Sequence, residues 1–227
     1  MDVEIKQYLD DSLVALNSIV LGKPGEIKLA LTAVLAAGHL LIEDLPGMGK
    51  TTLAQAMSKV LGLTHQRIQF TSDVLPSDVV GVTVFNQHSG EFSFHEGPIF
   101  CNFLLADEIN RTTPKSQSAL LEAMEEGKVT TEGVTRALPE PFFVIATQNP
   151  SHQTGTYPLP ESQLDRFLLR IQLGYPDSDS ERTLLKSGNR RNMISDCEAI
   201  LDVEKIKQLQ QRVSQIRVSD ALLDYLQ

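Results

Sequence analysis

A glycine-rich turn between a short apolar run and a helical pattern constrains this sequence most. His39–Ile42 is apolar and is bounded by glycine and acidic residues, as is typical of a buried parallel strand. Glu43–Gly49 follows, with glycine at 47 and 49, and a helical pattern begins at Lys50. A strand, a glycine-rich loop and a helix in this order predict an α/β fold with a helix N-terminus directed at an anion.

The residues of this turn match the chemistry of phosphate binding. Glycines let the backbone approach phosphate oxygens, Lys50 supplies a mobile cation, and Thr51 offers a hydroxyl to Mg²⁺. The pattern G-x-x-x-x-G-K-[ST] asks for glycine at position 44, where this chain has Asp44. An ordinary glycine-rich turn from strand to helix is the alternative interpretation.

Two acidic residues follow a second apolar run. Leu104–Ala106 reads as a strand, and Asp107 and Glu108 stand at its carboxyl end, where parallel sheets bind ligands. We expect Asp107 to hold Mg²⁺ beside Thr51, and Glu108 to act as the general base on an attacking water. The alternative is a solvated strand end that leads into a helix cap.

Two further polar residues belong to the predicted site. Asn149 follows the apolar run Phe142–Ala146 and could contact the γ-phosphate or position water beside Glu108, although an Asn-Pro turn with Pro150 is the simpler interpretation. Arg166 precedes another apolar run. Its guanidinium could stabilise the charge on a phosphoryl group during transfer, and a surface ion pair is the alternative role.

Apolar runs and amphipathic helical patterns alternate along the chain. This alternation predicts a parallel five-stranded sheet with helices on both faces. The expected strands are His39–Ile42, Arg67–Phe70, Phe103–Ala106, Phe142–Ala146 and Phe167–Ile171. Two segments with turn signals, Val82–Phe94 and Val129–Leu138, predict β-hairpins. After Tyr175 the composition becomes polar and helical, so we expect a core over residues 1–175 and a separate helical segment over 176–227.

Charge and hydropathy limit the possible partners. The 227 residues carry a formal net charge of −9, which argues against a surface that coats nucleic acid. No apolar run is long enough for a transmembrane helix, and no signal peptide is recognisable, so a cytoplasmic protein is expected.

Together these motifs resemble the AAA+ ATPases, and specifically the MoxR family. The residues that carry the resemblance extend from the phosphate loop through five short motifs, which are Ala106–Arg111, Gln117–Met124, Ala146–Pro150, Tyr157–Glu161 and Gln163–Phe167. The resemblance implies a P-loop NTPase core with ATP and Mg²⁺ as cofactors. It also implies a Walker A motif at Pro46, Gly47, Met48, Gly49, Lys50, Thr51 and Thr52.

The same resemblance assigns roles to further residues. It implies Walker B at Asp107 and Glu108, sensor 1 at Asn149, and an arginine finger at Arg166 that acts on a neighbouring subunit. The adenine is expected near Val20, Leu21 and Gly22. Asn110 and Arg111 are typical of the family, and a contact at a helix start is the physical role expected for them.

At the level of the whole protein, the resemblance implies a chaperone-like remodeller. Relatives form hexameric rings whose pore is lined by the two hairpins, act on client proteins, and often work with a von Willebrand factor A-domain partner. The chain ends before the position of the sensor 2 arginine, so a truncated lid is expected. Two alternatives remain, a nucleic-acid motor and a nucleotide-gated binding module with little turnover. The hairpin segments, which contain Arg136 as their single basic residue, argue against the motor.

Overall fold

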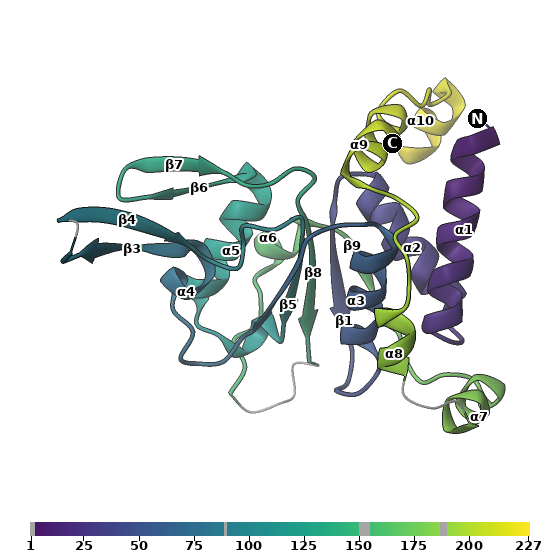
Figure 1. Cartoon of the computed structure of the whole chain (residues 1–227). Coiled ribbons are helices and arrows are strands. Elements are labelled where there is room, and N and C mark those ends of the chain that lie inside the picture. The colour runs from purple at the N-terminus through teal and green to yellow at the C-terminus, as the bar shows by residue number, and fades with distance from the viewer. Residues whose placement is uncertain (1–2, 89, 150–154, 187–189) are drawn as a thin grey trace.

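The computed structural model describes residues 3–88, 90–149, 155–186 and 190–227, with a five-stranded sheet at the centre (Figure 1). All neighbouring strands pair in parallel, in the order β2-β5-β8-β1-β9. The strands are β1 (His39–Glu43), β2 (His65–Gln69), β5 (Phe103–Asp107), β8 (Phe143–Gln148) and β9 (Phe167–Ile171). The predicted parallel sheet is therefore confirmed, with strand ends shifted by one or two residues.

Helices cover both faces of the sheet, as predicted. On one face lie α1 (Val3–Ile19), α2 (Pro24–Leu35) and α3 (Lys50–Val60). On the other lie α4 (Pro76–Val80), the 3₁₀ turn η1 (Ile109–Arg111), α5 (Pro114–Glu126) and α6 (Glu161–Leu164). None of the helices in the described residues is long and apolar enough to cross a membrane.

The core consists of two hydrophobic layers separated by the sheet. Successive strand residues point to opposite faces, so Phe103 and Leu105 join the cluster beneath α1, α2 and α3, whereas Leu104 joins the cluster beneath α5. Phe103 is fully buried and its ring centroid lies 5.2 Å from that of Phe143 on the neighbouring strand. This packing holds the amino ends of β5 and β8 together, and the predicted site residues extend from the opposite, carboxyl ends of the same strands.

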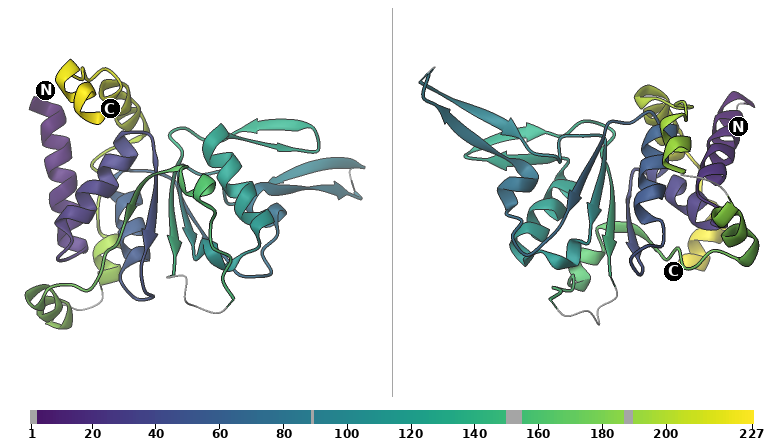
Figure 2. Two further views of the ribbon diagram at one scale, coloured as in Figure 1. Left: turned by 180° about the vertical axis from the view of Figure 1, so that it is seen from behind. Right: turned by 60° about the horizontal axis from the view of Figure 1, so that its bottom comes forward.

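Two β-hairpins project from one end of the molecule, side by side in both views of Figure 2. The first pairs β3 (Gly81–Asn86) with β4 (Glu91–Glu96), and the second pairs β6 (Lys128–Thr131) with β7 (Val134–Ala137). Both predicted hairpins are confirmed, and the second begins one residue earlier than expected and so includes Lys128.

The chain after residue 175 is helical, as the sequence indicates. It forms α7 (Ser178–Lys186), α8 (Arg190–Ser195), α9 (Val203–Val213) and α10 (Asp220–Leu226). Ile206 and Leu209 of α9 are buried in the same cluster as α1, α2 and α3, whereas the side chains of α10 are exposed. The main-chain oxygen of Val60, the last residue of α3, accepts hydrogen bonds from the N–H groups of Ile200 and Leu201, 2.9 and 3.1 Å away.

A buried histidine links β1 to the neighbouring strand β8 and to helix α5. Nδ1 of His39 accepts a hydrogen bond from the main-chain N–H of Val144, and Nε2 lies 3.1 Å from the main-chain oxygen of Met124. The neutral ring with a proton on Nε2 satisfies both contacts, because a protonated ring would direct a second N–H at a donor. Burial lowers the pKa of His39 below its ordinary value of 6.5, against a smaller opposing effect of the Met124 hydrogen bond.

This arrangement predicts a loss of stability in acid. The folded-state pKa of His39 is below that of the unfolded chain, so the unfolded chain takes up a proton first as the pH falls. The contribution of His39 is therefore present above about pH 6.5 and declines below it. Urea unfolding at pH 7.5 and 5.5 should show a smaller decline for His39→Gln than for the unsubstituted chain or for the exposed control His88→Gln. Equal declines in all three would contradict this role.

Candidate functional site

The predicted phosphate loop and acidic pair meet at one pocket of about 340 Å³. The pocket lies between the start of α3 and the carboxyl ends of β2 and β5, at the edge of the sheet where the sequence places it. Its lining consists of Pro46, Gly47, Gly49, Lys50, Thr51, Thr52, Arg67, Gln69, Asp107 and Glu108. Donors and a cation therefore face carboxylates across a space of small-molecule size.

Two glycines give the loop its shape. Gly47 and Gly49 have φ of +87° and +88°, a region that residues with a side chain rarely adopt. Gly49 is the N-cap of α3, and no side-chain hydrogen bond caps the helix. The first N–H groups of α3 are thus available to an anion, and the helix dipole favours one there.

Lys50 is buried at the base of the pocket. Its Nζ donates to the main-chain oxygen of Asp44 at 2.7 Å and to Oδ1 of Asn149 at 3.5 Å. Burial lowers the pKa of Lys50, and the nearby carboxylates of Asp107, Asp44 and Glu108 oppose this by favouring the charged form.

Asp44, which departs from the phosphate-loop pattern, has a structural role. Its Oδ2 accepts a hydrogen bond of 2.6 Å from the main-chain N–H of Gly174, and its Oδ1 accepts one of 2.8 Å from the N–H of Leu45. A glycine would lack both acceptors. The side chain therefore ties the predicted phosphate loop to the segment that leaves β9.

Asp107 is held by groups from both neighbouring strands. Oδ1 accepts a hydrogen bond of 2.6 Å from the Thr147 hydroxyl, and Oδ2 forms an ion pair of 2.7 Å with Arg67. Arg67 also donates to Gln69. Sequence reasoning missed Arg67, because a basic residue in an edge strand has no local signal that distinguishes it from a solvated side chain.

Glu108 stands in an unusual backbone conformation. Its φ of +58° and ψ of +46° are left-handed, which is uncommon for a residue other than glycine and is concentrated at functional sites. Oε1 accepts a hydrogen bond from Nδ2 of Asn149 at 3.1 Å. Oε2 accepts from Gln69 at 3.1 Å and from Arg111 at 2.9 Å. The structure thus brings Asn149 and Glu108 together, as predicted.

The expected helix-start contact is wrong for Asn110, which is buried and whose side-chain amide binds the main chain of Asn149. The reason is that η1 lies against the end of β8, so this amide reaches the neighbouring strand and not its own turn. Arg111 forms its ion pair with Glu108, the residue at the start of the same turn. Pro150, of the predicted Asn-Pro turn, lies outside the described residues.

Several predicted site residues do not line this pocket. Arg166 forms an ion pair with Glu125 at 2.7 Å, the surface contact that the sequence left open. Val20 is buried in the core, Leu21 is partly buried, and a Cβ on Gly22 would lie 2.7 Å from Oγ of Ser180. Gly22 therefore lies beside α7, and Val20–Gly22 are not among the residues that line this pocket.

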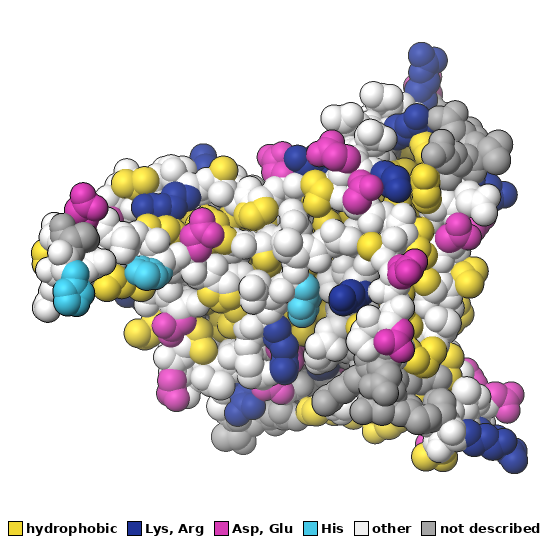
Figure 3. Space-filling model, viewed as in Figure 1, with side chains coloured by type: hydrophobic (Ala, Val, Ile, Leu, Met, Phe, Trp, Pro, Cys, Tyr) yellow, Lys and Arg dark blue, Asp and Glu magenta, His cyan; other side chains and the backbone are white. Residues whose placement is uncertain are grey.

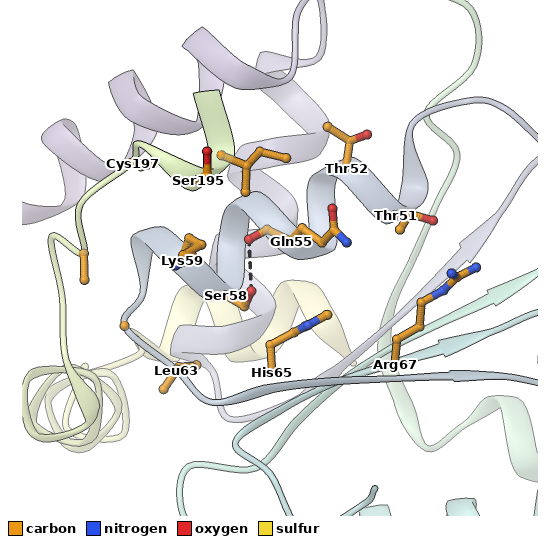
Figure 4. Close-up of a pocket in the computed structure, with 13 residues that line it drawn as sticks. Thr51, Thr52, Gln55, Ser58, Lys59, Leu63, His65, Arg67, Ser195 and Cys197 are labelled. Carbon is orange, nitrogen blue, oxygen red and sulfur yellow. Dashed lines mark hydrogen bonds between the residues drawn. The ribbon is translucent and has the colours of Figure 1, made fainter. Parts of the chain in front are cut away.

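A larger cavity of about 1110 Å³ adjoins the site along α3 (Figure 4). It shares Thr51, Thr52 and Arg67 with the smaller pocket, and Figure 4 shows Arg67 reaching from β2 toward the end of α3 that carries Thr51. None of its described lining residues is Asp or Glu. Of the two spaces, the smaller pocket contains the carboxylates, Asp107 and Glu108, and we take it as the candidate active site.

The donor set of the smaller pocket fits a nucleoside triphosphate with a divalent cation. The exposed N–H groups at Gly49 and the Lys50 ammonium suit phosphate oxygens, and the Thr51 hydroxyl and Asp107 carboxylate suit Mg²⁺. Among the described residues, no group of three or more His, Cys, Asp or Glu side chains could hold a metal by itself. A cation here would share its coordination with phosphate and water, as Mg²⁺ does.

Comparison with known proteins gives consistent results. The model of the ATPase family associated with various cellular activities (AAA) matches residues 39–169. Chaperone MoxR1 of Mycobacterium tuberculosis is 40% identical over 96% of this chain and 57% of its own length. Protein YeaC of Bacillus subtilis is 47% identical over 98% of this chain and 70% of its own. The chain thus spans between about half and 70% of these relatives.

A solved structure has the same fold. The crystal structure of a Cytophaga hutchinsonii protein assigned as an ATPase is 37% identical, covers 98% of this chain and 68% of its own, and superposes with a TM-score of 0.85. This TM-score shows that the two chains share one overall fold. The chain therefore belongs to the AAA ATPases, and within them to the MoxR type.

Proposed function

We propose that this chain binds ATP with Mg²⁺ and hydrolyses it. The observation that carries the proposal is that one pocket brings together a phosphate-binding helix start, a buried lysine and a strained, carboxylate-bearing residue. Release of inorganic phosphate from ATP, measured with and without Mg²⁺, tests it directly. Turnover that is independent of Mg²⁺, or no turnover above that of a Glu108→Gln variant, would refute it.

Each side chain has a part in this proposal. The loop N–H groups and Lys50 bind and orient the phosphates. Mg²⁺, when bound through Thr51 and Asp107, supplies charge neutralisation at the phosphate oxygens. Glu108 takes a proton from the attacking water while the water oxygen bonds to the γ-phosphorus and ADP leaves, and Asn149 holds the carboxylate in place.

We further propose a homo-oligomer, a hexameric ring in the whole protein, with Arg166 acting on the nucleotide of a neighbouring subunit. The guanidinium of Arg166 can stabilise the negative charge of a phosphoryl group, and it does not line the pocket of its own subunit. Its Glu125 partner is exposed, so release of this ion pair costs little. The adenine contacts at Val20–Gly22 and an incomplete lid over 176–227 stay predictions.

Remodelling of client proteins in the cytoplasm is the cellular role that we propose. MoxR1, the relative named a chaperone, supports it, as do the hairpins, which expose Phe92 (74%) and Phe85 (49%).

The basic side chains of the second hairpin already have partners. Arg136 lies 3.7 Å above the ring of Phe94, and Lys128 pairs with Glu126. On the face drawn in Figure 3, basic side chains lie among acidic and neutral ones, so protein suits this surface better than nucleic acid. The von Willebrand factor A-domain partner stays a prediction.

Replacement of Lys50 by alanine tests nucleotide binding. We expect about 10- to 100-fold weaker binding of a fluorescent ATP analogue, because charge-assisted hydrogen bonds contribute about 1.5–3 kcal/mol. Lys59→Ala is the matched control, since Lys59 lies in the last turn of the same helix and does not line the phosphate pocket. Unchanged affinity in Lys50→Ala, or an equal loss in Lys59→Ala, would contradict the assignment.

A further inference from the structure

The side chain of Asn110 continues the sheet where its main-chain pairing stops. The register between β5 and β8 ends at the pair Ala106 and Ala146, and β8 itself ends at Gln148. One residue later, Nδ2 of Asn110 donates to the main-chain oxygen of Asn149 at 2.9 Å. Oδ1 of Asn110 accepts from the N–H of Asn149 at 3.4 Å. One amide side chain thus makes both hydrogen bonds that a neighbouring strand would make.

This amide is itself held firmly. Asn110 is 2% exposed, and its main-chain oxygen accepts a hydrogen bond of 2.6 Å from the N–H of Tyr157. Nε2 of the buried Gln117 lies within 3.3 Å of the main-chain oxygens of Ile109, Thr112 and Tyr157. The turn that carries Asn110 is therefore braced from the side opposite Asn149.

The side chain of Asn149 depends on this placement. From its clamped backbone it reaches Oε1 of Glu108 with Nδ2 and receives Nζ of Lys50 on Oδ1. A residue just beyond a strand end has two free backbone torsions, and a shift of about 1 Å at such a site is enough to weaken catalysis severely. Neither Asn110 nor Asn149 lines the pocket, so the effect expected from Asn110 passes through the hydrogen bonds that Asn149 makes to the lining residues Lys50 and Glu108.

We propose that Asn110 is a positioning residue, whose amide fixes the backbone of Asn149 so that its side chain bridges Lys50 and Glu108. The consequence for turnover rests on the proposed ATP hydrolysis, whereas the backbone clamp does not. Only an amide serves both contacts. Alanine removes them, and aspartate keeps the acceptor but directs an oxygen at the carbonyl of Asn149 and buries a charge.

The first test follows the backbone of the nucleotide-free chain by NMR. Removal of the clamp in Asn110→Ala should speed amide hydrogen exchange of Asn149 by roughly five- to tenfold, as expected for the loss of a hydrogen bond. Asn102→Ala is the matched control, because it removes another buried asparagine amide, at the amino end of β5, whose hydrogen bonds go to Thr64 and Pro141 and not to Asn149. Unchanged exchange at Asn149 in Asn110→Ala, or equal acceleration in Asn102→Ala, would overturn the proposal.

The second test separates chemistry from binding. Asn110→Ala and Asn110→Asp should each lower kcat by about 10- to 100-fold and change KM for ATP by less than about threefold, because a lost orienting contact acts mainly in the transition state. In an Asn149→Ala background, Asn110→Ala should have little further effect. Full additivity of the two substitutions would overturn the proposal. Absence of turnover in the unsubstituted chain would refute the proposed function and leave the exchange test as the measure of the clamp.

Discussion

Replacement of Glu108 by glutamine is expected to lower ATP turnover by about 10²- to 10⁴-fold, the range that general-base catalysis contributes. Glutamine keeps the size of the side chain and an oxygen for one hydrogen bond, but it cannot take a proton from water. Nucleotide affinity should be retained, since the phosphate loop and Lys50 are untouched. Steady-state phosphate release and binding of an ATP analogue, measured on the same preparation, check both expectations.

Glu122→Gln serves as the control for this substitution. Glu122 is an exposed residue of α5 that does not line the pocket, so its replacement should leave turnover within about twofold. Turnover in Glu108→Gln equal to that of the unsubstituted chain would refute the role of the base. Negligible turnover of both Glu108→Gln and the unsubstituted chain would instead support the alternative of a nucleotide-gated binding module.

Replacement of Phe103 by alanine should have the largest effect on stability. The side chain is fully buried and packs against Phe143 and His65, so its loss leaves a cavity between β5, its neighbours and the helices above. A decrease of about 3–5 kcal/mol in the free energy of unfolding is expected. Urea unfolding, followed by far-UV circular dichroism, measures it.

Phe92→Ala provides the comparison with an exposed ring. Phe92 lies on β4, is 74% exposed and packs against the ring of Phe85 at 5.0 Å, so its removal should lower the free energy of unfolding by no more than about 1.5 kcal/mol. A similar loss in the two variants would show that Phe103 does not contribute to the core as described. A loss of client binding by Phe92→Ala alone would support the proposed role of the hairpins.

The features that could be predicted from the sequence are those whose signals are local. Four- and five-residue apolar runs locate the strands, and glycines at 47 and 49 mark the phosphate loop, because each pattern is determined by neighbouring residues. The acidic pair could be placed by its position at a strand end. The order of strands in the sheet is not local, and it required the structure.

Contacts between distant residues could not be predicted in the same way. Gly174 is 130 residues from Asp44, and Asn149 is 39 residues from Asn110. A buried asparagine has the same sequence signal whether it caps a turn or clamps a strand, and for this reason the expected role of Asn110 was wrong. Arg67 and Gln69 likewise acquire their partners only when β2 lies next to β5.

The attachment of residues 200 and 201 to the end of α3 has a mechanical consequence. Eleven residues of helix, about 16 Å at 1.5 Å per residue, join Lys50 to Val60. A Cβ on Gly62 would lie 2.4 Å from the carbonyl oxygen of Leu201, so the two segments are in contact without room for slippage. Helix α3 therefore joins the candidate active site at its first turn to residues 200 and 201 at its last. A movement of α3 as a rigid body would carry the main chain of these residues with it.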